Sequence, residues 1–310
     1  MKAIQYKDYG NSSVIEYVEI QKPIIQTEND ILIQIKAVGV NPIDMKIRNG
    51  FMKQVRPVVM PFIPGGEASG VIVEVGGKVS KFKVGDEIIV LPKINTYAEF
   101  VVANENSVLL KPKSLTFEEA ASIGVNIGTA QSVLLNEGKL EKGQRVLIQG
   151  GGGSAGGAMI QMAKSVGAYV IATASGNGLA LAKKLGADEL IDYKSQDVSI
   201  LVKNVDLVAD TAGGESQAKL FQVLKPGGTL LSIVIPPSKE LTEQYKVKAG
   251  FVSSDTSPKN VQNGIELLEA GKFSPIVAKT FKLEEAATAQ DFLSAGGVNG
   301  KVVLVVAALQ

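Results

Sequence analysis

A run of glycines in the middle of the chain offers backbone amides for chemistry. Gly150, Gly153 and Gly156 recur at a spacing of three. The apolar run 145–149 before them predicts a β-strand, and apolar residues of 159–166 fall on one helical face. Such a loop leaves free N–H groups at a helix N-terminus, where the dipole favours an anion. The segment predicts a dinucleotide pyrophosphate site, with a structural turn as the alternative, and its binding residues would be Gly150, Gly153, Ser154, Ala155 and Gly156.

The end of the next predicted strand, 169–173, bears on which dinucleotide binds. A site for NAD usually places Asp or Glu there, on the ribose 2′-hydroxyl. No acid occurs from Val170 to Ala187, which disfavours NAD and leaves space for a 2′-phosphate. We therefore expect NADPH, without excluding NADH, because no basic residue stands at the strand end. The candidate contacts, for which an ordinary exposed loop is the alternative, are Ser175, Asn177, Tyr193 and Lys194.

The side chains that most often carry enzyme chemistry are missing. The chain has no His and no Cys. This excludes imidazole bases, Ser-His-Asp triads, thiol nucleophiles, disulfides and Cys or His metal ligands, and we expect no metal site. A hydride-carrying cofactor suits such a chain, because the cofactor supplies the difficult step.

The elements around the glycine loop predict a parallel sheet covered by helices. Strands are expected again at 205–209 and 229–234, with a helix near 215–224 between them, and these strands are apolar on both faces. Thr211 and Ser232 lie at their carboxyl ends, where open sheets bind ligands, and are further cofactor-binding candidates. The region before residue 115 is β-rich instead, and we expect the terminal run 301–306 to pair back with it.

Charge and hydropathy exclude some partners. The 310 residues carry 32 basic and 31 acidic side chains, a net charge of +1, so no basic field is available for nucleic acid. The apolar stretch at 302–309 is too short to cross a bilayer, and the charged N-terminus does not resemble a signal peptide. We expect a cytoplasmic protein without membrane insertion.

Short motifs lie along nearly the whole chain, at 38–44, 61–70, 84–86, 97–100, 146–164, 185–188, 223–228 and 300–304. Together they resemble the medium-chain dehydrogenase/reductase superfamily, in its zinc-independent quinone oxidoreductase branch. The resemblance implies an α/β fold with a Rossmann domain, 116–254, inserted in a GroES-like catalytic domain, 1–115 plus 255–310. It also implies a site between the domains, NADPH as the usual cofactor and a homodimer.

The resemblance also bears on zinc. Gly66 stands where zinc-binding relatives carry His, before the matching Glu67. Without His or Cys neither zinc site of those relatives can form. Glu67 would then order the cleft or have a structural role, and we favour the structural one.

Further site residues are implied by the resemblance alone. Asn41 and Asp44 match a motif near the nicotinamide and would orient a carbonyl oxygen or a water, although Asx residues beside Pro42 also form turns. Tyr97 would donate a proton or simply pack. Three more positions match residues that approach the cofactor: Thr129, Phe251 and Val252. Nearby, Gly124 and Asn126 depart from the family pattern.

The function implied is an NADPH-dependent oxidoreductase that transfers hydride to a small-molecule quinone or an α,β-unsaturated carbonyl (an enone or enal), without zinc. The alternatives are a non-catalytic NADPH-binding sensor or structural protein and an enoyl-thioester reductase. An RNA-binding role, known among relatives, is disfavoured by the neutral charge.

Overall fold

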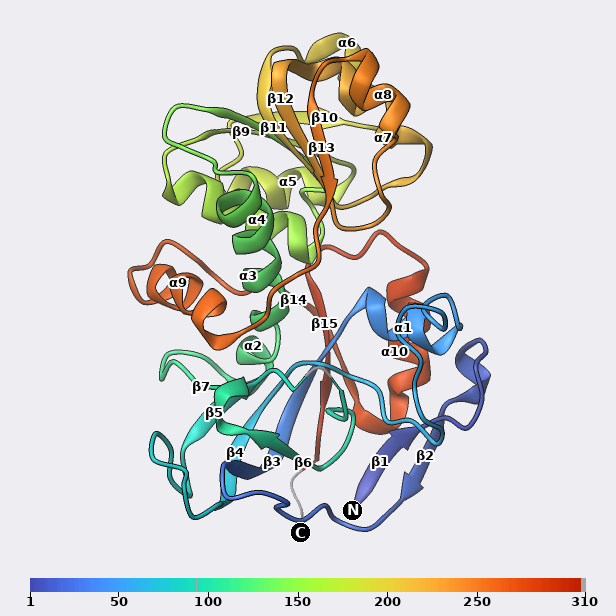
Figure 1. The fold of residues 1–310 in the computed structure, drawn as a ribbon, viewed down its shortest axis with the longest axis vertical. Helices are drawn as coiled ribbons and strands as arrows, with labels where there is room; N and C mark the ends of the chain where they lie inside the picture. The colour runs from blue at the N-terminus through green and yellow to red at the C-terminus, as the bar shows by residue number, and fades with distance from the viewer. Residues whose placement is uncertain (93, 308–310) are drawn as a thin grey trace. The chain divides into compact units, whose positions relative to one another are not determined.

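The computed structural model describes residues 1–92 and 94–307, and these form two compact units. Unit 1 comprises Met1–Gly124 and Pro275–Gln310, and unit 2 comprises Val125–Ser274 (Figure 1). The sequence placed the boundaries earlier, at 115/116 and 254/255. Helix α9 (Pro258–Glu269) accounts for the second difference, because Asn260 Nδ2 donates to the carbonyl of Gly128, 3.2 Å away.

Unit 2 is built on a six-stranded sheet in the order β10-β9-β8-β11-β12-β13. All neighbouring strands are parallel, as predicted. The central strand β8 is fully buried at Val146, Leu147 and Ile148, which is typical of a parallel sheet covered on both faces. The strands are β8 (Arg145–Gln149), β9 (Tyr169–Ala174), β10 (Glu189–Asp192), β11 (Val205–Asp210), β12 (Leu224–Ser232) and β13 (Lys248–Phe251).

The helices of unit 2 connect these strands. The helix expected near 215–224 is not continuous; three short elements stand there instead. They are η4 (Gly214–Ser216), α7 (Gln217–Leu220) and η5 (Phe221–Val223). The others are α3 (Gly124–Ala130), the π-helix η3 (Gln131–Glu137), α4 (Ser154–Ser165), α5 (Asn177–Lys184), α6 (Val198–Leu201), α8 (Lys239–Gln244) and α9.

Unit 1 holds a larger, mainly antiparallel sheet in the order β14-β15-β3-β4-β5-β7, with β6 also paired to β3. The terminal strand pairs back as predicted, because Val302 lies opposite Val40 and Leu304 opposite Val38. The strands are β3 (Asp30–Val40), β4 (Ala68–Val75), β5 (Glu87–Val90), β6 (Phe100–Asn104), β7 (Val108–Leu110), β14 (Val277–Lys282) and β15 (Lys301–Val305).

Smaller elements complete unit 1. Strands β1 (Lys2–Gln5) and β2 (Glu16–Glu19) form a separate pair. The helical elements are η1 (Ser12–Val14), α1 (Pro42–Arg48), η2 (Glu105–Ser107), α2 (Phe117–Ala120), η6 (Leu283–Glu285) and α10 (Ala286–Ser294). Within residues 1–92 and 94–307, no helix has the length and apolar character that crossing a membrane requires.

Candidate active site

The glycine loop of unit 2 presents a set of backbone N–H donors for an anion. Gly150 turns the chain after β8 with φ of +83°, a conformation that favours glycine. Helix α4 then begins at Ser154, and its N-cap residue, Gly153, makes no side-chain cap. The N–H groups of the first turn are therefore not capped by a side chain and are available to a pyrophosphate.

The glycines of this loop differ in what surrounds them. A Cβ at Gly156 would lie 2.2 Å from the Gly150 carbonyl oxygen, so Gly156 lets α4 pack closely on the loop. A Cβ at Gly153 would meet nothing closer than that same oxygen, at 3.4 Å. Space therefore remains beside Gly153 for a ligand to approach the backbone, and the loop fits a dinucleotide pyrophosphate.

The residues that follow β9 and β10 lie close together. Ser175 Oγ donates to Tyr193 Oη over 2.9 Å, and Tyr193 is 59% exposed. Asn177 begins α5. The nearby carboxylate of Asp192 accepts the backbone N–H of Lys194 at 3.0 Å. The end of β9 thus presents two neighbouring hydroxyls and no acid of its own.

Two other predicted contacts are engaged inside the protein. Thr211 Oγ1 donates to the Gln149 carbonyl over 2.6 Å, which ties the end of β11 to β8. Ser232 is fully buried, and its hydroxyl donates to Asp210 over 2.9 Å. Each of these two hydroxyls therefore donates its proton to a group of the protein at the edge of the sheet.

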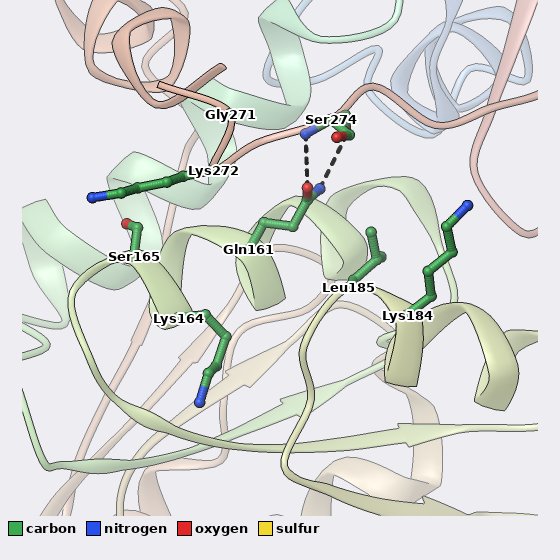
Figure 2. Close-up of a pocket in the computed structure, with 8 residues that line it drawn as sticks. All are labelled: Gln161, Lys164, Ser165, Lys184, Leu185, Gly271, Lys272 and Ser274. Atoms are coloured by element: carbon green, nitrogen blue, oxygen red, sulfur yellow. Dashed lines mark hydrogen bonds between the residues drawn. The ribbon is translucent and has the colours of Figure 1, made fainter. Parts of the chain in front are cut away.

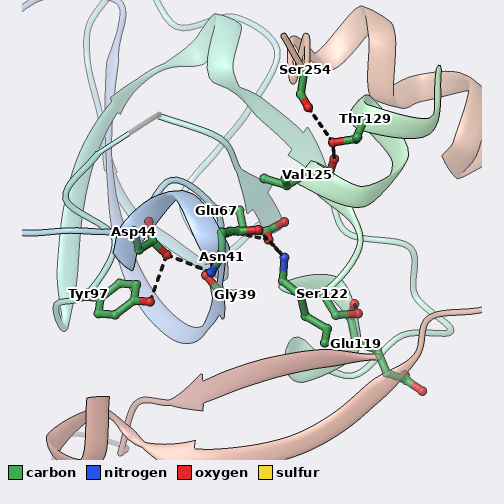
Figure 3. A network of polar contacts seen from close by, with 11 residues as sticks. Gly39, Asn41, Asp44, Glu67, Tyr97, Glu119, Ser122, Val125, Thr129 and Ser254 are labelled. Carbon is green, nitrogen blue, oxygen red and sulfur yellow. Dashed lines mark hydrogen bonds and ion pairs between the residues drawn. The ribbon is translucent and has the colours of Figure 1, made fainter. Parts of the chain in front are cut away.

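The remaining predicted contacts of unit 2 lie on α3 and at the end of β13. Thr129 Oγ1 donates to the Val125 carbonyl and lies 2.7 Å from Ser254 Oγ (Figure 3). Because that hydroxyl has one proton, Ser254 is the donor in the second contact. Phe251 is 53% exposed, whereas Val252 is buried and its N–H donates to the Ser232 carbonyl over 2.8 Å.

A buried polar network in unit 1 joins the three residues predicted as catalytic. Asn41 is the N-cap of α1, and Pro42 occupies the first helical position. The Asn41 N–H donates to Asp44 Oδ2 over 2.9 Å. The Tyr97 hydroxyl donates to the same oxygen over 3.0 Å (Figure 3). All three side chains are buried.

The Asn41 amide is held at both ends by charged groups. Lys301 Nζ donates to Asn41 Oδ1 over 2.6 Å, and Asn41 Nδ2 donates to Glu67 Oε1 over 3.0 Å. Lys301 also forms an ion pair with Glu67, and both side chains are buried. Lys301 was not predicted as a site residue, although it stands in the motif 300–304 that carries the resemblance.

Burial sets the protonation behaviour of this network. Burial raises the pKa of Asp44 to about 6, although the Asn41 N–H, the Tyr97 hydroxyl and the Lys301 charge favour the carboxylate. The pKa of Tyr97 lies well above its usual value, because of burial and then of the Asp44 charge. Tyr97 therefore keeps its proton at neutral pH, while Asp44 changes its charge close to neutral pH.

A surface hollow in unit 2 lies elsewhere. It encloses about 510 Å³, and Lys164 and Ser165 at the carboxyl end of α4 line it, whereas the glycine loop stands at the amino end. Its lysine side chains point in different directions, as Figure 2 shows for Lys164, Lys184 and Lys272, and Lys164 is paired with Asp188 over 2.8 Å. The hollow is therefore no candidate for cofactor binding. In the part of the chain that the structure describes, no acidic cluster suited to a metal ion occurs.

Comparisons with known proteins agree with this architecture. Residues 27–137 match the family described as alcohol dehydrogenase GroES-like domain, and residues 185–304 match the family described as zinc-binding dehydrogenase. The mitochondrial NAD(P)H oxidoreductase RTN4IP1 of Danio rerio is 33% identical, over 96% of this chain and 89% of the relative. The 2-methylene-furan-3-one reductase of Solanum lycopersicum is 35% identical, over 98% of this chain and 79% of the relative.

A solved structure extends the agreement to three dimensions. The quinone oxidoreductase from Coxiella burnetii superposes with a TM-score of 0.89, at 31% identity, over 99% of each chain. The relatives are oxidoreductases by name, and the similarity spans both units. The chain is an oxidoreductase and belongs to the medium-chain dehydrogenase/reductase superfamily, in its quinone oxidoreductase-like branch.

Proposed function

We propose that this protein is an NADPH-dependent reductase that transfers hydride to a quinone or to the β-carbon of an enone or enal, without zinc. The observation that carries the proposal is the glycine loop between β8 and α4. Its uncapped first-turn amides and the space beside Gly153 suit a dinucleotide pyrophosphate.

The residues at the end of β9 bear on the preference for NADPH over NADH. Ser175 and Tyr193 form a hydroxyl pair there, where a carboxylate would bind the ribose of NAD. A carboxylate would repel a 2′-phosphate, whereas hydroxyls donate to it. This supports NADPH over NADH, with Ser175, Asn177 and Tyr193 as the contacts.

The acceptor class is argued from the relatives and from the side chains of unit 1. One relative is named for reducing 2-methylene-furan-3-one, an enone, and others are named for quinones. When bound, the nicotinamide supplies a hydride, so the protein needs only to orient the acceptor and to manage one proton. We assign the proton to Asp44, because its pKa of about 6 lets it take up and release a proton near neutral pH.

Asn41 and Tyr97 have positioning roles in this proposal. The Asn41 amide is engaged by Lys301 and Glu67, so it orients its neighbours instead of offering a free donor to an oxyanion. The Tyr97 hydroxyl donates to Asp44 and fixes the direction of that carboxyl group. The chain has no His or Cys, which supports a mechanism without zinc.

We also propose a homodimer, as is usual in this branch. Strand β13 has a partner on one side only, in the part of the sheet that the structure describes. Such an edge is a site where a second copy can add strands.

The test is cofactor oxidation followed by absorbance. The protein is given NADPH or NADH with one quinone or one short enone, and the products are identified. We expect turnover with at least one acceptor and a higher kcat/KM for NADPH. Tight NADPH binding without turnover on either acceptor would contradict the reductase and favour the non-catalytic sensor.

A further inference from the structure

One buried lysine in unit 1 contacts the residues of the proposed site but has not been given a role of its own. Lys301, the first residue of β15, is 2% exposed. Its ammonium contacts the Glu67 carboxylate and donates to Asn41 Oδ1 over 2.6 Å. Buried charges are costly unless they are paired and hydrogen-bonded, so this placement calls for an explanation.

The contacts of Lys301 fix the orientation of the Asn41 amide. An ammonium group can only donate, and a carboxylate can only accept. Lys301 therefore holds the oxygen of the Asn41 amide, while Glu67 holds its nitrogen, with Nδ2 to Oε1 at 3.0 Å. If the Asn41 amide were flipped, its NH₂ group would face the Lys301 ammonium and its oxygen would face the Glu67 carboxylate, and neither contact could be a hydrogen bond.

The same chain of contacts reaches the carboxyl group of Asp44. The Asn41 backbone N–H and the Tyr97 hydroxyl both donate to Asp44 Oδ2, over 2.9 and 3.0 Å. We propose that Lys301 is a positioning residue: paired with Glu67, it holds Asn41, and through Asn41 it holds Asp44 and Tyr97 in the arrangement that the reaction uses. This inference rests on the proposed function, since it assigns Lys301 to the same site.

Charged and titratable groups from several elements face Asp44. Tyr97 donates to it, and the charges of Lys301 and Glu67 act on it with opposite signs. Tyr6, which follows β1, interacts with Asp44 as well. Arg48 lies on α1, as Asp44 does. It interacts electrostatically with Tyr6 and Tyr97 and donates a hydrogen bond to Gln290 of α10. Substituting Lys301 or Glu67 therefore removes one charge near Asp44 at a time and leaves Tyr6, Tyr97 and Arg48 in place.

The experiment follows the Asp44 carboxyl by ¹³C NMR in the full chain, with its signal assigned by Asp44→Asn. We expect Lys301→Met to raise the titration midpoint above the parent value, because a cation is lost. Glu67→Gln is expected to lower it, because an anion is lost. The double variant Lys301→Met/Glu67→Gln is expected to return close to the parent, and Lys301→Arg, which keeps the charge, to stay there.

Turnover supplies the second readout. We expect Lys301→Met to lower kcat on the order of 10²-fold, as a misplaced reacting group does, with KM for NADPH within about twofold. We expect the double variant to regain thermal stability but not turnover, because its Asn41 amide is no longer held between two charges. This variant keeps the test decisive if Lys301→Met fails to fold.

A matched control is available in the same unit. Lys111 is also buried, donates to the carbonyls of Pro112 and Leu115, and pairs with Glu87. Lys111→Met should leave the Asp44 midpoint and kcat unchanged. Equal midpoints in the parent, Lys301→Met and Glu67→Gln would overturn the inference, as would full turnover in the double variant. If the parent protein reduces no acceptor, the NMR midpoints still show whether Lys301 and Glu67 act on Asp44, and only the proposed function fails.

Discussion

At the scale of single residues, the most informative group is the buried carboxyl of Asp44. Its pKa rises from the usual 3.8 to about 6, mainly through burial. In the range between these values the folded state binds more protons at this group than the unfolded chain does. The contribution of Asp44 to stability is therefore largest below pH 4 and is lost as the pH rises through about 6.

The variant Asp44→Asn tests this sign. An Asn oxygen can keep both hydrogen bonds that Asp44 Oδ2 accepts, but it does not ionise. Each pKa unit corresponds to about 1.4 kcal/mol, so the free energy of unfolding of the parent should fall by about 2.4 kcal/mol relative to Asp44→Asn between pH 4 and pH 7.5. Urea unfolding at the two pH values measures it. A difference independent of pH would show that Asp44 titrates normally in the fold.

At the scale of elements, two glycines of the loop have different roles: Gly156 allows close packing of α4, and Gly153 leaves space for a ligand. In Gly156→Ala the new methyl group meets the Gly150 backbone, 2.2 Å away. Helix propensity alone would favour Ala over Gly by about 1 kcal/mol. We expect a loss of about 1–3 kcal/mol instead, because overpacking forces the backbone to shift. Thermal unfolding measures the effect.

Gly153→Ala is the matched variant in the same loop. Its methyl group meets nothing closer than 3.4 Å, so stability should stay within about 0.5 kcal/mol of the parent. That methyl group would occupy the space through which a pyrophosphate approaches, so Kd for NADPH should rise at least tenfold in a fluorescence titration. NADPH binding by Gly153→Ala equal to that of the parent would remove the loop from the cofactor site.

The elements also show how far the sequence could be used. The parallel strands of unit 2 were predictable, because both faces are buried and each strand is a short apolar run. Helix α1 was not predicted, although Asn41, Pro42 and Asp44 stand at the N-cap, N1 and N3 positions that open a helix. Their sequence context predicts a turn or a site equally well, so Asn41 and Asp44 were expected only in those roles. The prediction of one helix near 215–224 was wrong for another reason, because the helix propensity of the residues does not show where a helix is interrupted.

At the scale of the whole molecule, sequence patterns do not predict contacts between residues that are far apart in the chain. Lys301 and Asn41 are 260 positions apart, and Lys301 looked like the polar start of a strand. The sequence predicted that β15 returns to the N-terminal sheet, since the apolar run 301–306 needs a partner. It did not predict that Lys301 would be buried against Glu67, because that pairing depends on the register of β15 on β3.

The two units should differ in their ability to fold alone. Unit 2 is one continuous stretch, 125–274, whereas unit 1 needs both chain ends. A fragment 1–124 lacks β15, which pairs with β3, and leaves the fully buried Glu67 without its Lys301 partner. Removing one partner of a buried ion pair costs about 3–5 kcal/mol, and an unpaired edge at β3 adds to the loss.

We therefore expect 125–274 to unfold cooperatively in urea and to bind NADPH, because it retains β8, α4 and the ends of β9 and β10. The fragment 1–124 should be unfolded by circular dichroism. Adding the separate piece 275–310 should restore structure to it, since that piece supplies β14, β15 and α10. A cooperatively folded 1–124 would contradict the argument, because it would show that the β3 edge and Glu67 do not depend on the C-terminal strand.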